Sequence, residues 1–186
     1  MNLANRITIL RIILIPFFIA AIVYSRMDIA LICFTLAVIS DGIDGFIARA
    51  MDQKTQLGTI LDPMADKLLL MSAFISLAVA KNIPDQLRLP PYVPIIIISR
   101  DAFIVLGTII IFFIKGDVEI RPSIAGKITT FFQMMTIVSV LVRFKYSYIV
   151  WNLAVLLTVV SSIGYLLQGS RMLNGNISAR SGADKA

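Results

Sequence analysis

Six long apolar segments dominate this chain and limit the folds that are open to it. They cover residues 7–25, 29–49, 58–80, 92–114, 124–142 and 148–167. A helix needs about 20 apolar residues to cross a hydrocarbon core of about 30 Å, and most of the segments reach that length. Transmembrane β-strands are shorter and alternate strictly between apolar and polar residues, which these segments do not. The sequence therefore predicts an all-α integral membrane protein with six transmembrane helices.

The composition narrows the chemistry that such a protein can carry. Of the 186 residues, 58% are hydrophobic, and the formal net charge is +6. The basic residues are spread over the predicted loops, which fits contact with anionic lipid and argues against nucleic-acid binding. The chain has no histidine and a single cysteine, Cys33, so it has neither histidine ligands nor an internal disulfide. Any bound metal must be held by oxygen, which favours Mg²⁺ or Mn²⁺.

The distribution of basic residues also predicts the orientation. Six spans place both termini on one side, and loops rich in Lys and Arg stay in the cytoplasm. The side with the termini holds nine basic residues: Arg6, Arg49, Lys54, Lys115, Arg121, Lys127, Arg171, Arg180 and Lys185. The opposite side holds five: Arg26, Lys81, Arg88, Arg143 and Lys145. We therefore expect a multi-pass protein of the cell (inner) membrane, with a transmembrane domain over residues 1–168 and a loose, polar cytoplasmic tail over 169–186.

Four aspartates inside the predicted spans mark the candidate site. Two are near the end of the second segment and two near the start of the third: Asp41, Asp44, Asp62 and Asp66. Carboxylates are costly within a bilayer, so acids there indicate function. Helical spacing places each pair on one face of its helix. The connection over residues 50–57 is short, so the two helices are expected to be antiparallel neighbours whose four carboxylates converge below the inner surface.

Four converging carboxylates would repel one another unless cations balanced them. One or two divalent ions would do so, and we favour this interpretation. Small residues nearby leave room for a bulky ligand such as a nucleotide: Gly42, Gly45, Ala48 and Gly58. Two alternatives stay open, namely acids that line a proton or cation pathway and acids that pair with Lys67 and Arg100.

The acids belong to a longer spaced pattern, Asp41-x₂-Asp44-Gly45-x₂-Ala48-Arg49-x₈-Gly58-x₃-Asp62-x₃-Asp66. This pattern resembles the motif of the CDP-alcohol phosphotransferases, in which an alcohol attacks the β-phosphorus of a CDP-linked lipid and releases CMP. The resemblance implies two divalent ions, Mg²⁺ or Mn²⁺, held by the four aspartates, with Asp66 also the catalytic base. It implies that four further positions bind CDP: Gly45, Ala48, Arg49 and Gly58. It also implies a homodimer.

Two other segments resemble the bacterial phosphatidylglycerophosphate synthases of that family, which use CDP-diacylglycerol and glycerol 3-phosphate. One is residues 2–11, where Asn5 and Thr8 either bind CDP or cap the first helix. The other is residues 125–130, where Lys127 either binds a phosphate near a helix start or is a plain loop lysine. We predict the activity of those synthases.

The fourth segment departs from that pattern. Ser99-Arg100-Asp101 looks more like the cardiolipin synthases of the same family, whose acceptor is phosphatidylglycerol, so that activity is the alternative. A cation- or proton-coupled transporter is the alternative outside the family. The candidates for binding the acceptor phosphate are Arg100, Arg121 and Lys127. Arg100 lies deeper than the aspartates, so either its helix extends past the inner surface or it only neutralises a nearby acid.

Overall fold

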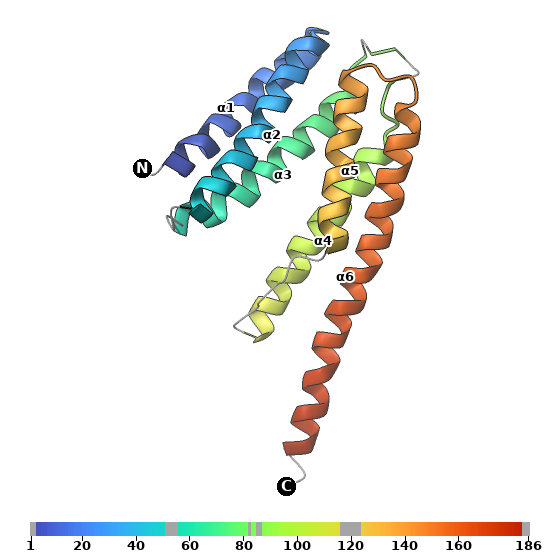
Figure 1. Ribbon diagram of the computed structural model, residues 1–186. Coiled ribbons are helices and arrows are strands. Elements are labelled where there is room, and N and C mark those ends of the chain that lie inside the picture. The colour runs from blue at the N-terminus through green and yellow to red at the C-terminus, as the bar shows by residue number, and fades with distance from the viewer. Residues whose placement is uncertain (1–2, 51–55, 82, 85–86, 116–123, 184–186) are drawn as a thin grey trace.

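The computed structural model describes the chain except residues 1–2, 51–55, 82, 85–86, 116–123 and 184–186. Side chains are described for residues 8–41, 64–81, 83–84, 87–107 and 124–165. The described part of the chain consists of six helices and short segments between some of them: α1 Leu3–Val23, α2 Met27–Ala50, α3 Gln56–Val79, α4 Tyr92–Lys115, α5 Ile124–Leu141 and α6 Ser147–Ala183 (Figure 1).

The first five helices begin and end within about one helical turn of the predicted apolar segments. The sixth continues well beyond its predicted end and projects from the bundle to Ala183 (Figure 1). The prediction of a loose tail is therefore wrong for residues 169–183. This stretch has no proline, which would break the helix, but it holds three glycines, so helix propensity alone does not account for the extension. Whether it forms a unit separate from residues 1–168 stays a prediction.

The helices form two groups of three (Figure 1). In the first group α1 contacts both α2 and α3, and in the second α6 contacts both α4 and α5. Contacts of α3 with α4 and α5, and of α2 with α5, join the groups. Figure 1 shows α2 and α3 running in opposite directions, as the short connection predicted. Among the described residues, however, each of them packs mainly against α1, which we had not expected.

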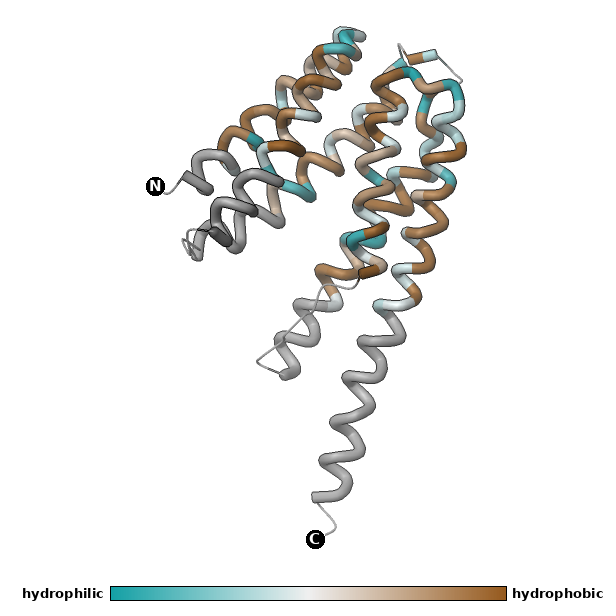
Figure 2. The backbone as a smooth tube through the Cα atoms, viewed as in Figure 1, coloured by the Kyte–Doolittle hydropathy of each residue, from teal (hydrophilic) through white to brown (hydrophobic). Residues whose placement is uncertain are grey.

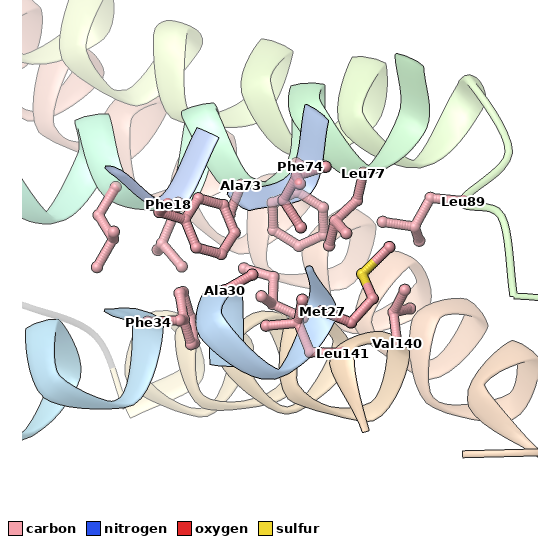
Figure 3. Close-up of a cluster of buried hydrophobic side chains, with 14 of the residues drawn as sticks. Phe18, Met27, Ala30, Phe34, Ala73, Phe74, Leu77, Leu89, Val140 and Leu141 are labelled. Atoms are coloured by element: carbon pink, nitrogen blue, oxygen red, sulfur yellow. The ribbon is translucent and has the colours of Figure 1, made fainter. Parts of the chain in front are cut away.

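A cluster of buried apolar side chains holds the two groups together (Figure 3). Phe18 of α1 packs against Phe34 of α2 with ring centroids 5.9 Å apart. Buried alanines such as Ala30 and Ala73 let helix backbones approach closely in the same region. Val140 and Leu141 of α5 reach the same cluster from the second group. Close packing of this kind is what associates helices in lipid, where neighbouring acyl chains are as apolar as leucine.

Among the described side chains, every helix exposes large apolar residues, and apolar residues predominate along the coloured parts of the helices (Figure 2). Phe17 of α1 is 62% exposed and Phe103 of α4 is 71% exposed. Soluble monomers rarely expose apolar patches above a few hundred Å². Within the described residues, Ile124–Leu141 and Ser147–Tyr165 are long and apolar enough to cross a membrane, and Thr8–Val23 is a shorter apolar helix. The exposed apolar surface therefore supports a lipid-facing exterior.

Candidate active site

The centre of the candidate site is Arg11 of α1, which lies between an acid of α2 and an acid of α3. Its Nη1 donates a hydrogen bond of 2.5 Å to Oδ1 of Asp66. Its Nη2 lies 2.8 Å from Oδ1 of Asp41. The arginine side chain is 0% exposed, whereas each carboxylate side chain is 35% exposed. Two of the four predicted acids therefore meet, and they meet through a cation.

The helical period explains why these side chains point inward. Asp41 lies four residues after the last member of the buried stripe of α2, which consists of Ala30, Phe34 and Ala37. Asp66 lies four residues before the first member of the corresponding stripe of α3, which consists of Leu70, Ala73 and Leu77. On α1, Arg11 shares the buried face of Thr8 and Phe18. The three charges thus continue the apolar interfaces of their helices.

The charges of the three groups compensate one another. Removing an ion from water carries a penalty of several kcal/mol, and charge-assisted hydrogen bonds to both carboxylates offset it for Arg11. Together the three groups carry one net negative charge. Their partly exposed carboxylate oxygens, presented from two helices, are the donors that hard ions such as Mg²⁺ prefer. The described donor set therefore fits a divalent ion.

This fit rests on two of the four acids. Among the described side chains, no group of three or more Asp, Glu, Cys or His is placed to hold a metal. Most other predicted site residues have side chains outside the described residues: Asn5, Asp44, Gly45, Ala48, Arg49, Gly58 and Asp62. Arg121 lies outside them altogether. Thr8 is buried one turn before Arg11, and Lys127 is exposed in the first turn of α5.

A second polar cluster joins α3, α4 and α6, and Asp101 is its centre. Nζ of Lys67 contacts Oδ2 of Asp101, and Nη1 of Arg100 donates to Oδ1 of the same carboxylate at 2.6 Å. Arg100 also donates from Nη2 to Oγ of Ser161 at 3.1 Å, and its guanidinium lies 5.5 Å from the ring centroid of Tyr165. Its Nε is buried with no hydrogen-bond partner within the described part of the chain.

This cluster changes the interpretation of Lys67 and Arg100. The sequence left open that they pair with the four aspartates of the motif, but the described acid partner of both is Asp101. Of the two readings of Arg100, the contacts favour neutralisation of a nearby acid. Binding of an acceptor phosphate by Arg100 would require it to act from within this buried network, so that role stays a prediction.

Helix α3 connects the two clusters because Asp66 and Lys67 are consecutive. Successive residues on a helix point about 100° apart, so α3 presents the acid to Arg11 of α1 and the lysine to Asp101 of α4. The polar region therefore reaches from α1 to α6 across the bundle.

Comparison with known proteins identifies the class of this chain. Residues 1–160 match the family described as CDP-alcohol phosphatidyltransferase. The chain belongs to this family of membrane enzymes, which use divalent metal ions. It is therefore an enzyme, and the resemblance read from the spaced acids and glycines is confirmed.

Several individual members of the family are similar to this chain along most of its length. The chain is 30% identical to the CDP-diacylglycerol–glycerol-3-phosphate 3-phosphatidyltransferase of Aquifex aeolicus, over 93% of this chain and 98% of that protein. It is 33% identical to the protein of the same name from Bacillus subtilis, over 88% of this chain and 93% of that protein. It is also 27% identical to the human cardiolipin synthase (CMP-forming), over 91% of this chain and 62% of that protein.

Sequence reasoning did not identify Arg11 and Asp101 as site residues. Arg11 is the one charged residue in the first apolar segment, residues 7–25. The rule that drew attention to the aspartates, that charge within a span indicates function, applies to it equally. Asp101 satisfies the same rule in the fourth segment. The contacts of Arg11 with Asp41 and Asp66, and of Asp101 with Lys67, could not be inferred, because these partners lie on helices distant in sequence.

Proposed function

We propose that this enzyme transfers a phosphatidyl group from CDP-diacylglycerol to glycerol 3-phosphate, which releases CMP and forms phosphatidylglycerophosphate. The observation that carries the proposal is the meeting of Asp41 and Asp66 at Arg11, inside the segment that matches the family. The names of the Aquifex and Bacillus relatives support the choice of acceptor. The oxygen-only donor set supports the choice of divalent ions.

Two divalent ions, Mg²⁺ or Mn²⁺, would be held by Asp41, Asp44, Asp62 and Asp66. When bound, they would neutralise the diphosphate and stabilise the departing CMP. The CDP group would lie against the small and basic positions of the motif, with two residues of α1 at its nucleotide end: Gly45, Ala48, Arg49, Gly58, Asn5 and Thr8. Small residues allow such a group to approach the helix backbones closely.

Asp66 would act as the general base. Its carboxylate is partly exposed, so an acceptor hydroxyl can reach it, and Arg11 fixes its orientation. As the proton moves to Asp66, the hydroxyl oxygen forms a bond to the β-phosphorus and the bond from that phosphorus to the oxygen of CMP breaks. Positioning and charge stabilisation supply most of the rate in such a transfer.

The acceptor phosphate would be bound by Lys127, Arg121 and Arg100. Lys127 is exposed in the first turn of α5, where a helix N-terminus favours an anion. Arg100 is buried and paired, so its contribution would depend on the Asp101 network. Cardiolipin synthase is the second candidate, because Ser99-Arg100-Asp101 departs from the synthase pattern and the human enzyme of that name is similar along most of this chain.

An acceptor assay with purified protein tests the function. CDP-diacylglycerol is supplied with either glycerol 3-phosphate or phosphatidylglycerol, and CMP release and the lipid product are measured. We expect CMP and phosphatidylglycerophosphate with glycerol 3-phosphate. CMP release only with phosphatidylglycerol would assign the cardiolipin synthase reaction. CMP release with neither acceptor would reject both candidate reactions.

We further propose six membrane spans within residues 1–168, with both termini and the active site on the cytoplasmic side of the cell membrane, and a homodimer. The exposed apolar surface of all six helices supports the spans. The excess of basic residues on the side of the termini supports the orientation. The family resemblance supports the dimer.

A further inference from the structure

The contacts of Arg11 give this residue a role that the family motif does not include. One guanidinium nitrogen reaches Asp66 on α3 and another reaches Asp41 on α2, each through an Oδ1 atom. A guanidinium is planar and rigid, so two nitrogens on one carbon fix the separation of the oxygens that they bind. Arg11 therefore sets how far apart the two carboxylates lie.

The exposure of the three side chains shows from which side a further cation would approach. The Arg11 side chain is 0% exposed and lies on the protein side of the carboxylates, which are each 35% exposed. An ion arriving from outside would meet the open side of the acids while the guanidinium stays behind them. Arginine and ion would then act on the same two carboxylates together.

The charges have two opposite consequences for such an ion. Without the arginine, the two carboxylates would lose the cation that lies between them, and like charges within a poorly solvated interface repel strongly. With the arginine, the site is held together, but a fixed positive charge lies a few ångströms from the position that a divalent ion would occupy. That charge opposes binding of the ion.

We propose that Arg11 is the resident counter-cation of the acidic site: it holds Asp41 and Asp66 together in the absence of a divalent ion and weakens the site's affinity for that ion. The inference rests on the proposed function for its metal site. It makes Arg11 a positioning residue, because it acts through the carboxylates and not on the substrate.

The test measures Mn²⁺ binding directly, by electron paramagnetic resonance of the free ion, on the full chain in detergent. The variants are R11Q, which removes the charge, and R11K, which keeps the charge but loses the planar pair of nitrogens. Arg26 is exposed in the turn between α1 and α2, so R26Q is a control with the same change of charge at a distance from the site. For R11Q we expect binding that is about tenfold tighter, and for R11K and R26Q binding within about threefold of the unchanged protein.

Thermal stability provides a second readout that separates this role from ordinary packing. We expect Mn²⁺ to raise the Tm of R11Q, relative to EDTA, by clearly more than it raises that of the unchanged protein or R26Q. A packing role alone would lower the Tm of R11Q equally with and without the ion. Equal shifts, or Mn²⁺ binding in folded R11Q that is unchanged or weaker, would overturn the proposal.

A variant that does not fold still decides the question. If R11Q does not accumulate without metal, we expect folded protein to be recovered either by Mn²⁺ or by adding D41N, which restores the charge balance. Failure of both would reject the counter-cation role. Failure of the proposed function looks different: Mn²⁺ binding would respond to R11Q as predicted while no acceptor released CMP.

Discussion

Replacing Asp101 by asparagine should destabilise the protein far more than the same change at an exposed site. The substitution keeps the shape of the side chain but removes the charge that compensates Arg100, which is buried and also has an unpartnered Nε among the described contacts. Breaking a buried ion pair by removing one partner costs about 3–5 kcal/mol. Loss of the contact with Lys67, whose side chain is 37% exposed, adds only about 0–1 kcal/mol.

Two features place the expected value near the lower end of that range. Arg100 keeps its hydrogen bond to Ser161, and asparagine still offers one acceptor oxygen. We therefore expect a loss of about 3 kcal/mol, which corresponds to a decrease in Tm of about 6–12 °C for a domain of this size. D28N is the matched control, because Asp28 is exposed in the first turn of α2 and the change there is worth about 0.3–1 kcal/mol.

The single tryptophan, Trp151, reports the transition, because it is buried in the apolar core and its fluorescence changes on unfolding. Unfolding of D101N and D28N in the same detergent gives the comparison. The double variant R100M/D101L removes both buried charges and should recover more than half of the lost stability. A decrease in Tm no larger for D101N than for D28N would show that Asp101 does not compensate Arg100, and the argument from burial would fail.

Three other predictions concern the site and its orientation. D66N should lower CMP release at least about 100-fold while CDP-diacylglycerol binding persists; unchanged turnover would remove Asp66 as the base. EDTA should abolish activity, added Mg²⁺ or Mn²⁺ should restore it, and D41N should raise the ion concentration required; activity that survives EDTA would reject the metal site. In a C33S background, a cysteine in place of Lys81 should react with impermeant thiol reagents only from outside intact cells, and one in place of Lys127 only after permeabilisation. The reverse pattern would invert the topology.

The helices could be predicted because each apolar segment is long and is bounded by polar or proline-containing turns. The inward direction of Asp41 and Asp66 could be predicted as well, since both continue buried stripes at helical spacing. The extension of α6 could not, because polar residues after a span are compatible with either a helix or a loose tail. A predicted membrane span ends where the residues become polar, but a helix can continue through polar residues.

The sequence could not predict which residues the charged side chains contact, and the reason is different. Helical spacing gives the face on which a side chain lies but not the helix that it meets. The short connection between the second and third segments predicted that their acids converge. It gave no sign that α1 packs against both helices and supplies Arg11, which lies between Asp41 and Asp66. Likewise Asp101 follows Arg100 directly, a spacing at which helical side chains do not normally face each other, and only the length of the arginine allows their contact.

The described charges of the polar region balance when they are taken together. Three cations face three acids: Arg11, Lys67 and Arg100 against Asp41, Asp66 and Asp101. A region of low dielectric tolerates such a set far better than it tolerates any member alone. If these six charges cancel, the negative charge that divalent ions would have to compensate would come from the two remaining acids of the motif, Asp44 and Asp62. The protein's own cations would then keep the bundle assembled, and the ions would be needed for catalysis more than for folding.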